Sequence, residues 1–237
     1  VLHAVLCSAL NSGQNHCNLA VARGLLRDIP MRPLAFLSLG LISTALHAAD
    51  AKRLNVLFIA VDDLRPEVNA SGSNLAKTPN LDRIAARGTT FDRAYCQQAV
   101  CSPSRTSLMT GRRPDATRVW DLETHFRKAL PDAVTVANHF KNHGYHSQAM
   151  GKIFHGGFDD APSWSVPWET PKAPAYASEA ALKMVADPAN IDKKGRARGP
   201  AVESADVPDD TYTDGKTARL AAKTLGALKQ KGQPFFL

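Results

Sequence analysis

An apolar run that ends in two adjacent carboxylates constrains the fold of this chain more than any other feature. Residues 55–61 read Asn-Val-Leu-Phe-Ile-Ala-Val and are followed directly by Asp62 and Asp63. Such a run is typical of a strand that is buried on both faces. Two acids at its carboxyl end repel each other unless a cation lies between them, and a hard divalent cation prefers oxygen ligands. We therefore expect a binding site at this strand end in an α/β sheet, although a solvated acidic turn gives the same pattern.

The segments that follow alternate between helical and extended patterns. Helices are predicted for residues 80–87, 134–142 and 211–231, and an extended segment for residues 145–150. Thr78 followed by Pro79 is a typical helix start, and Gly88 and Gly144 are typical stops. The alternation predicts an α/β fold with a mainly parallel sheet flanked by helices. Residues 156–210 lack periodicity, and we expect them to form a long irregular excursion.

The run from Cys101 to Arg112 carries the most specific motif of the chain. It reads Cys-Ser-Pro-Ser-Arg-Thr-Ser-Leu-Met-Thr-Gly-Arg. A helix is expected from residue 102 to residue 110, which would aim backbone N–H groups at an anion near Cys101. The five-residue core of the motif is also compatible with a small buried thiol beside a turn proline.

All twelve residues together resemble the sequence by which sulfatases mark a cysteine for oxidation to formylglycine. The resemblance implies that Cys101 is this residue and that its hydrated aldehyde is the nucleophile towards a sulfate ester. In the same family, which has an alkaline-phosphatase-like fold, the strand-Asp-Asp element opens the catalytic domain and binds calcium. The resemblance therefore implies a Ca²⁺ site formed by Asp62, Asp63 and Cys101.

A second element of the family is similar to the segment Gly151-Lys152-Ile153-Phe154-His155. The resemblance implies that Lys152 and His155 bind the sulfate group, where a cation and an imidazole would stabilise developing charge. His155 could also protonate the leaving alcohol or orient the diol. Arg105 offers a fork of donors to sulfate or to the diol. A surface lysine, an incidental histidine and an unrelated ion pair of Arg105 are the alternatives.

Further segments resemble iduronate-2-sulfatase and its bacterial relatives, which implies a sulfated saccharide as substrate and a formylglycine-generating maturation enzyme as partner. These segments are residues 121–127, 162–165, 207–209 and 234–237. Two other functions stay open. One is a phosphatase or phosphonate-ester hydrolase of the same superfamily, and the other is a non-catalytic, truncated protein that binds sulfated glycans.

Both ends of the chain carry information about processing. Residues 31–49 have a basic start, an apolar stretch and small residues at the end, which predicts a signal peptide and a secreted or periplasmic protein. The apolar stretch is too short for a stable membrane span. Residues 1–30 are expected to be an upstream extension. Residues 50–237 are expected to be the incomplete N-terminal part of a sulfatase domain, truncated at the C-terminus and inactive alone.

The positive charge of the chain limits the classes of binding partner that it suits. The formal net charge is +7, with a basic cluster at Lys193, Lys194, Arg196 and Arg198. Such a surface suits a sulfated glycan, and nucleic acid equally by charge, but no nucleic-acid-binding motif is present. Alternatively, an acidic remainder of the protein balances this positive charge.

Two cysteines, Cys96 and Cys101, lie outside the expected leader. Modification of Cys101 would leave Cys96 without a disulfide partner, whereas a Cys96–Cys101 disulfide would block that modification.

Overall fold

The computed structural model describes residues 5–9 and 53–237 of the chain. Its sheet has four strands in the order β1-β2-β4-β3, which are Val5–Ala9, Val56–Ala60, Phe235–Phe236 and His146–Ser147. β2 and β3 both run parallel to β4, and β1 pairs antiparallel with β2. The expected α/β fold with a mainly parallel sheet flanked by helices is confirmed.

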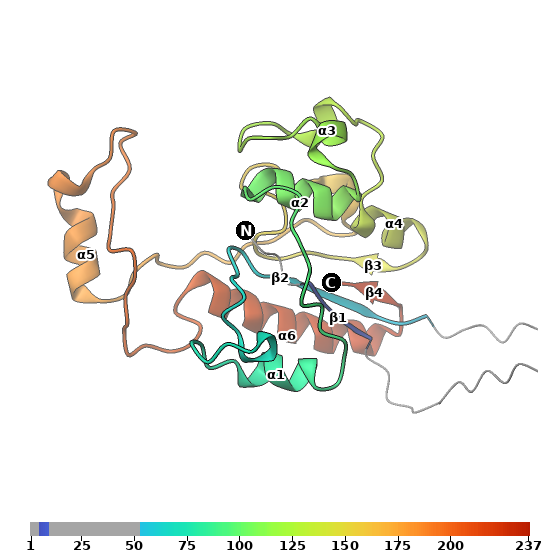
Figure 1. Ribbon diagram of the computed structural model, residues 1–237, viewed down its shortest axis with the longest axis horizontal. Helices are drawn as coiled ribbons and strands as arrows, with labels where there is room; N and C mark the ends of the chain where they lie inside the picture. The colour runs from blue at the N-terminus through green and yellow to red at the C-terminus, as the bar shows by residue number, and fades with distance from the viewer. Residues whose placement is uncertain (1–4, 10–52) are drawn as a thin grey trace, which may run out of the picture.

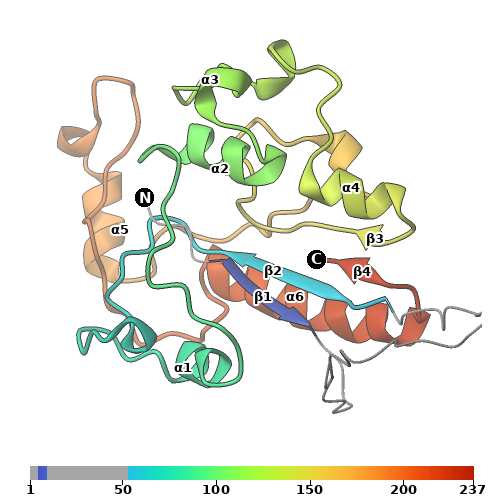
Figure 2. The ribbon, with the colours of Figure 1, turned by 45° about the vertical axis from the view of Figure 1, so that its right-hand side comes forward.

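Helices cover the two faces of this sheet (Figure 1). One layer contains α2, α3 and α4, which are Cys101–Thr110, Pro114–Thr117 and Val136–Asn142. The opposite layer contains α6 (Thr213–Lys231), with α1 (Pro79–Ala85) beside it, as the rotated view also shows (Figure 2). Among the residues that the structure describes, no helix is both long and apolar enough to cross a bilayer.

Neighbouring side chains of the central strands enter different cores because a strand points successive residues to opposite faces. Phe236 belongs to the core under α2 and α4, together with Met109 and Ala137. Phe235 belongs to the core against α6, together with Leu228. The strand at the end of the chain therefore ties both layers together.

The expectation that β2 is buried on both faces is wrong at its carboxyl end. Val56 and Phe58 pack against one core and Leu57 against the other. Ile59, however, is 40% exposed. It shares a face with Leu57 but belongs to neither core.

Local chemistry accounts for the helix ends. The side-chain oxygen of Thr135 accepts a hydrogen bond from the backbone N–H of Asn138 at 3.0 Å, so α4 begins at residue 136 and not at the expected residue 134. α2 ends at Gly111, whose φ of 66° is a left-handed conformation that glycine adopts without a steric penalty. α6 matches the expected helix with a later start, at residue 213.

Residues 156–210 are less irregular than expected. They contain α5 (Glu179–Ala186) and two 3₁₀ turns, Ala161–Ser163 and Pro188–Asn190; two further 3₁₀ turns occur at Asn69–Ser71 and Phe126–Lys128. The Ser178 side chain accepts a hydrogen bond from the N–H of Ala181 and starts α5. The predicted signal peptide at residues 31–49 lies outside the described residues.

Candidate active site at the start of helix α2

Three chain segments meet at the carboxyl end of β2. Asp62 and Asp63 lie just after β2, and Cys101 is the first residue of α2. Lys152 lies beyond β3, two residues after Met150, which forms a β-bridge with Glu169. Cys101 thus lies at the end of α2 where backbone N–H groups lack helical partners and the helix dipole is positive. The N-cap residue, Val100, makes no side-chain hydrogen bond to this helix start. The arrangement favours an anion beside Cys101.

Arg105 links these segments from inside the protein. Its side chain is 1% exposed. Its Nη1 donates to the backbone carbonyls of Lys152 and Ile153, the second at 3.0 Å. Its Nη2 donates to Oδ1 of Asp62 at 2.8 Å. The guanidinium therefore fixes the acidic end of β2 against the segment that carries Lys152. The Arg105 guanidinium thus donates hydrogen bonds to protein groups of the site, and its Nε is buried without a hydrogen-bond partner.

Asp62 receives a second cation from Lys152. The Lys152 ammonium lies 2.5 Å from Oδ2 of Asp62 and 3.7 Å from the Cys101 sulfur. Burial acts to raise the pKa of Asp62, but the hydrogen bonds and charges of Lys152 and Arg105 outweigh it and lower the pKa from 3.8 to about 2. The carboxylate is therefore ionised at neutral pH, as a metal ligand must be.

The predicted metal ligands are brought together. One potential ligand atom each of Asp62, Asp63 and Cys101 lies within 4.8 Å of the other two. Asp63 has a φ of 51°, a left-handed conformation that costs energy for most side chains and that aspartate tolerates better than most. The turned backbone brings the second carboxylate to the same side as the first.

His155 is not brought into contact with this cluster. Its ring lies beside Phe158, with a centroid distance of 6.2 Å, and its Nδ1 is buried without a hydrogen-bond partner. The neighbouring Phe154 stacks on Phe126 at 5.7 Å and belongs to the core. The position of His155 is thus set by packing, and its role stays a prediction.

The backbone just before Lys152 is held by residues that sequence reasoning missed. The Trp168 indole N–H donates to the carbonyl of Gly151 at 2.6 Å, and the Gly151 N–H donates to the carbonyl of Glu169 at 2.9 Å. A Cβ at Gly151 would lie 3.2 Å from the Thr217 methyl group, and the φ of Gly151 is 72°. A tryptophan inside an irregular polar stretch was the only sequence signal for this support.

A second missed feature is a polar network next to the His155 segment. Arg127 contacts Asp160 through two parallel hydrogen bonds of 2.9 and 2.8 Å, and the Ser163 hydroxyl donates to Asp160 at 2.6 Å. The Ser163 oxygen also lies 2.6 Å from the Thr135 oxygen. Asp160 is 2% exposed. The network fixes the loop after residue 155 against the start of α4.

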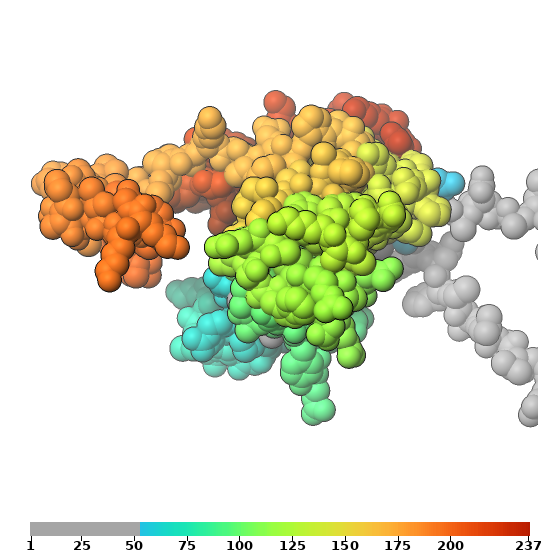
Figure 3. Space-filling model, turned by 90° about the horizontal axis from the view of Figure 1, so that it is seen from above, coloured from blue at the N-terminus to red at the C-terminus, as the bar shows by residue number. Residues whose placement is uncertain are grey.

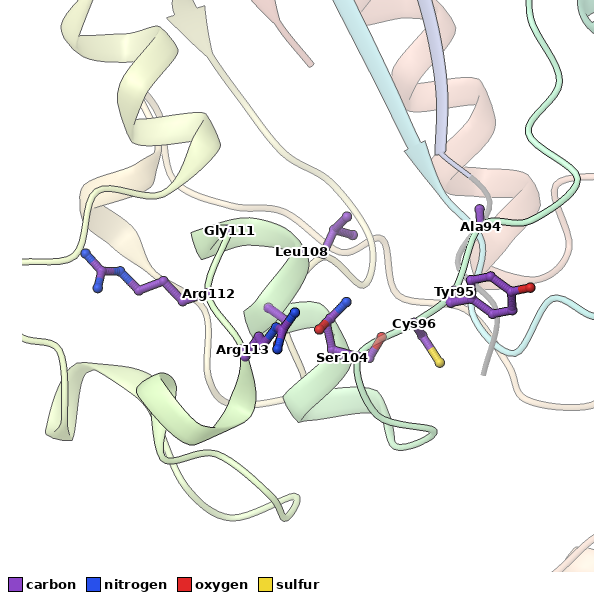
Figure 4. Close-up of a pocket in the computed structure, with 10 residues that line it drawn as sticks. Ala94, Tyr95, Cys96, Ser104, Leu108, Gly111, Arg112 and Arg113 are labelled. Atoms are coloured by element: carbon purple, nitrogen blue, oxygen red, sulfur yellow. The ribbon is translucent and has the colours of Figure 1, made fainter.

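A pocket of about 390 Å³ lies along the flank of α2 towards its C-terminal end (Figure 4). Its lining includes Cys96, Ser104, Ser107 and Arg113, and none of the candidate active-site residues named above lines it. The figure shows the Arg113 side chain turned towards α2 and that of Arg112 turned away. Cys96 and Cys101 are both free thiols, so the alternative disulfide is not formed in this structure.

Known proteins share this sequence pattern. The profile described as Sulfatase matches residues 54–237. Iduronate 2-sulfatase of Mus musculus is 39% identical over 80% of this chain and 34% of its own length, and that of Homo sapiens is 36% identical over 84% and 36%. A protein of Formosa agariphila described as Sulfatase is 39% identical over 53% of this chain and 27% of its own length. The chain spans about a third of the length of the two mammalian relatives, and it belongs to the sulfatase family.

Proposed function

We propose that the protein to which this chain belongs hydrolyses sulfate esters with the modified side chain of Cys101 as nucleophile. The single observation that carries this proposal is the convergence of Asp62, Cys101 and Lys152 at the open start of α2. An anion-binding helix end, a cation and a paired carboxylate around one cysteine fit an anionic ester better than a neutral one.

Cys101 requires conversion before it can act. The conversion is a two-electron oxidation of its Cβ carbon, in which an oxygen atom from an external oxidant replaces sulfur and the sulfur leaves as hydrogen sulfide. A formylglycine-generating maturation enzyme is the proposed partner for this step. When hydrated, the resulting aldehyde supplies one hydroxyl that attacks the ester sulfur and a second that allows sulfate to be expelled.

The closeness of the ligand atoms, and not their net charge, supports a divalent cation. Arg105 and Lys152 formally balance the two negative charges of Asp62 and Asp63. Asp62, Asp63 and residue 101 would hold Ca²⁺ through oxygen ligands once residue 101 carries oxygen in place of sulfur. The bound ion supplies positive charge that attracts the sulfate group and stabilises charge on its oxygens.

The remaining side chains would position the ester and manage its proton. Lys152, 39% exposed, can reach an anion at Cys101 because its ammonium already lies 3.7 Å from the sulfur. Arg105 holds Asp62 and the Lys152 backbone in place. His155 is proposed to give a proton to the departing alcohol oxygen when the S–O bond breaks. In total, the ester and one water give the alcohol, sulfate and one proton.

The substrate is proposed to be a sulfated saccharide. The two mammalian relatives described above are named iduronate 2-sulfatase, and their similarity covers most of the chain. The signal-peptide pattern of residues 31–49 supports secretion or export to a periplasm, where the protein would encounter polysaccharides. The particular sugar depends on loops and on parts of such relatives that this chain does not match.

Sulfate and phosphate esters of one alcohol distinguish this proposal from a phosphatase of the same superfamily. The protein as expressed in its host is expected to release sulfate much faster than phosphate, and Cys101→Ala is expected to remove at least about a thousandfold of that rate. Faster phosphate release would support the phosphatase. Equal, background-level release by both proteins would support the non-catalytic alternative.

A further inference from the structure

Residues 171–212 form an arm that stands off the rest of the molecule. Figure 1 shows α5 and the loop after it to one side, and Figure 3 shows the same residues as a separate lobe joined to the body by a narrow connection. Of the eight residues of α5, only Ala181 is buried. The arm therefore contributes little to the cores and has to be explained in another way.

Both ends of the arm are fastened beside the candidate active site. Before the arm begins, Trp168 donates a hydrogen bond to the carbonyl of Gly151, the residue that precedes Lys152. After it ends, the Thr217 methyl group of α6 lies against the same glycine. The Lys216 ammonium also donates to the carbonyl of Lys172 at 3.0 Å and joins the two ends. The arm thus projects from the site itself.

One carboxylate holds the two legs of the arm together. Glu203, on the returning leg, accepts hydrogen bonds from the N–H of Ala177 at 2.8 Å and from the hydroxyls of Ser178 and Tyr212 at 2.7 and 2.5 Å. A Cβ at Gly199 would lie 2.4 Å from the Tyr176 ring, so the legs approach closely at this glycine. The outer part of the arm is therefore held in a defined position.

Residues 190–198 form a compact turn farther along the arm than the contacts of Glu203, and we call it the basic turn. Ile191 pairs with Ala197, and the Asp192 carboxylate accepts hydrogen bonds from the N–H groups of Lys194 and Arg196, each at 2.9 Å. The guanidinium of Arg198 lies 2.6 Å from Asp192. A single acid organises the turn and leaves most of its positive charge facing solvent.

The basic turn has a strong excess of positive charge. Four cations, Lys193, Lys194, Arg196 and Arg198, face one acid, Asp192, which leaves a net charge of +3. Arg196 and Arg198 stay 59% and 60% exposed although both are paired. Within the described part of the chain, neither ammonium of Lys193 and Lys194 has a hydrogen bond or ion pair. The turn can therefore receive several anionic groups at once.

We infer that the basic turn binds a sulfated polysaccharide and holds the polymer while one of its sulfate groups enters the site beside Lys152. The inference rests on the proposed function for the class of substrate. Anionic polysaccharide is favoured over nucleic acid because the turn contains no aromatic residue on which a base could stack. Exposed arginines and lysines are sufficient for sulfate groups, which are recognised by charge and forked hydrogen bonds.

Binding of the 237-residue chain to a sulfated glycosaminoglycan, measured by calorimetry over a range of salt concentrations, tests this inference without any turnover. The variant K193Q/K194Q removes two charges and leaves the Asp192 contacts in place. The control K77Q/K223Q removes two exposed lysines outside the arm, so the net charge falls equally. We expect the arm variant to bind about tenfold more weakly at low salt, with a reduced salt dependence, and the control to bind nearly as the parent does.

Equal losses in both variants would overturn the inference, because binding would then follow net charge alone. Undiminished binding to the chemically desulfated polymer would also overturn it. A DNA duplex that bound more tightly, with the same dependence on Lys193 and Lys194, would assign the turn to nucleic acid. Hydrolysis of a small sulfate ester is expected to be unchanged in K193Q/K194Q. Failure of the proposed hydrolysis therefore appears in that assay and not in the binding data.

Discussion

Helix α2 is held by burial inside the protein, whereas the arm is held by polar contacts near its surface. Seven of the ten residues of α2 are buried, and its Arg105 donates hydrogen bonds to two backbone carbonyls and to Asp62. The arm is held by an organising carboxylate at its base, Glu203, and another in the basic turn, Asp192. Groups that stabilise developing charge must be positioned before the reaction, whereas a surface that binds a flexible polymer can tolerate motion.

The difference predicts where the protein opens first. Regions with few buried apolar contacts and exposed polar contacts unfold locally at low free energy, and packed regions open only with the whole domain. The arm is therefore expected to exchange its amide hydrogens before α2 does. Four substitutions test this difference between α2 and the arm.

Arg105→Ala is expected to have the largest effect. The change leaves two backbone carbonyls without their donor and leaves Lys152 as the remaining cation beside Asp62. Removing the buried partner of an ion pair costs about 3 to 5 kcal/mol of unfolding free energy. Urea unfolding measures the loss. Arg219→Ala serves as control, because Arg219 is 72% exposed beside Asp210 and should cost less than about 1 kcal/mol. Similar losses in both variants would contradict the difference between the two regions.

Asp160→Asn is expected to cost about 2 kcal/mol at neutral pH, since it removes a charged partner from the network of Arg127 and Ser163. Burial acts to raise the pKa of Asp160, but hydrogen bonds from Arg127 and Ser163 keep it below its usual value of 3.8. The carboxylate therefore stabilises the fold above pH 3.8, and this contribution is lost as pH falls through the lower folded pKa. Acid unfolding curves should be flatter for the variant below that pH. An unchanged slope would mean that the network does not form.

Gly215→Ala tests the point where the arm returns to α6. A Cβ there would lie 1.7 Å from the carbonyl oxygen of Asp209, so the turn must move, at an expected cost of about 1 to 2 kcal/mol. Gly226→Ala is the matched control, since nothing lies within 4 Å of its new Cβ and alanine favours the helix by up to about 1 kcal/mol. Thermal unfolding should move in opposite directions. A stable Gly215→Ala protein would show that the returning leg yields easily.

Glu203→Gln is expected to have the smallest effect on global stability. Glutamine offers one acceptor oxygen where the carboxylate uses two, so the contacts with Ala177, Ser178 and Tyr212 cannot all persist. Hydrogen exchange should rise in the arm and stay constant in α2. Faster exchange in both regions would show that the arm and the site open together.

Capping and periodicity made most helices predictable. The expected ends at residues 110 and 231 agree with α2 and α6, and each end is followed by a glycine in a left-handed conformation, Gly111 and Gly232. α5 was missed because prolines flank a short helical stretch, although Ser178 and the pair Glu179–Lys183 were valid signals. The exposure of Ile59 depends on packing between distant segments, which no local pattern records.

The grouping of the candidate ligands Asp62, Asp63 and Cys101 was predictable from the sequence, but the residues that support them were not. The two acids were recognised from the strand pattern that they end, and the motif at Cys101 from its resemblance to the sulfatase sequence. The contacts of Arg105 with the carbonyls of Lys152 and Ile153 join residues 47 and 48 positions apart. Carbonyl acceptors are present at every residue, so sequence does not reveal which of them a buried arginine will use.

Mass analysis of the peptide that contains residue 101, taken from protein expressed in its host, tests whether Cys101 is converted to formylglycine. We expect that a fraction of this peptide has lost one sulfur and two hydrogens and gained one oxygen, and that it reacts as an aldehyde. The Cys96 residue should keep its thiol mass and serve as the internal control. If residue 101 is found only as unmodified cysteine, the proposed formylglycine nucleophile does not form.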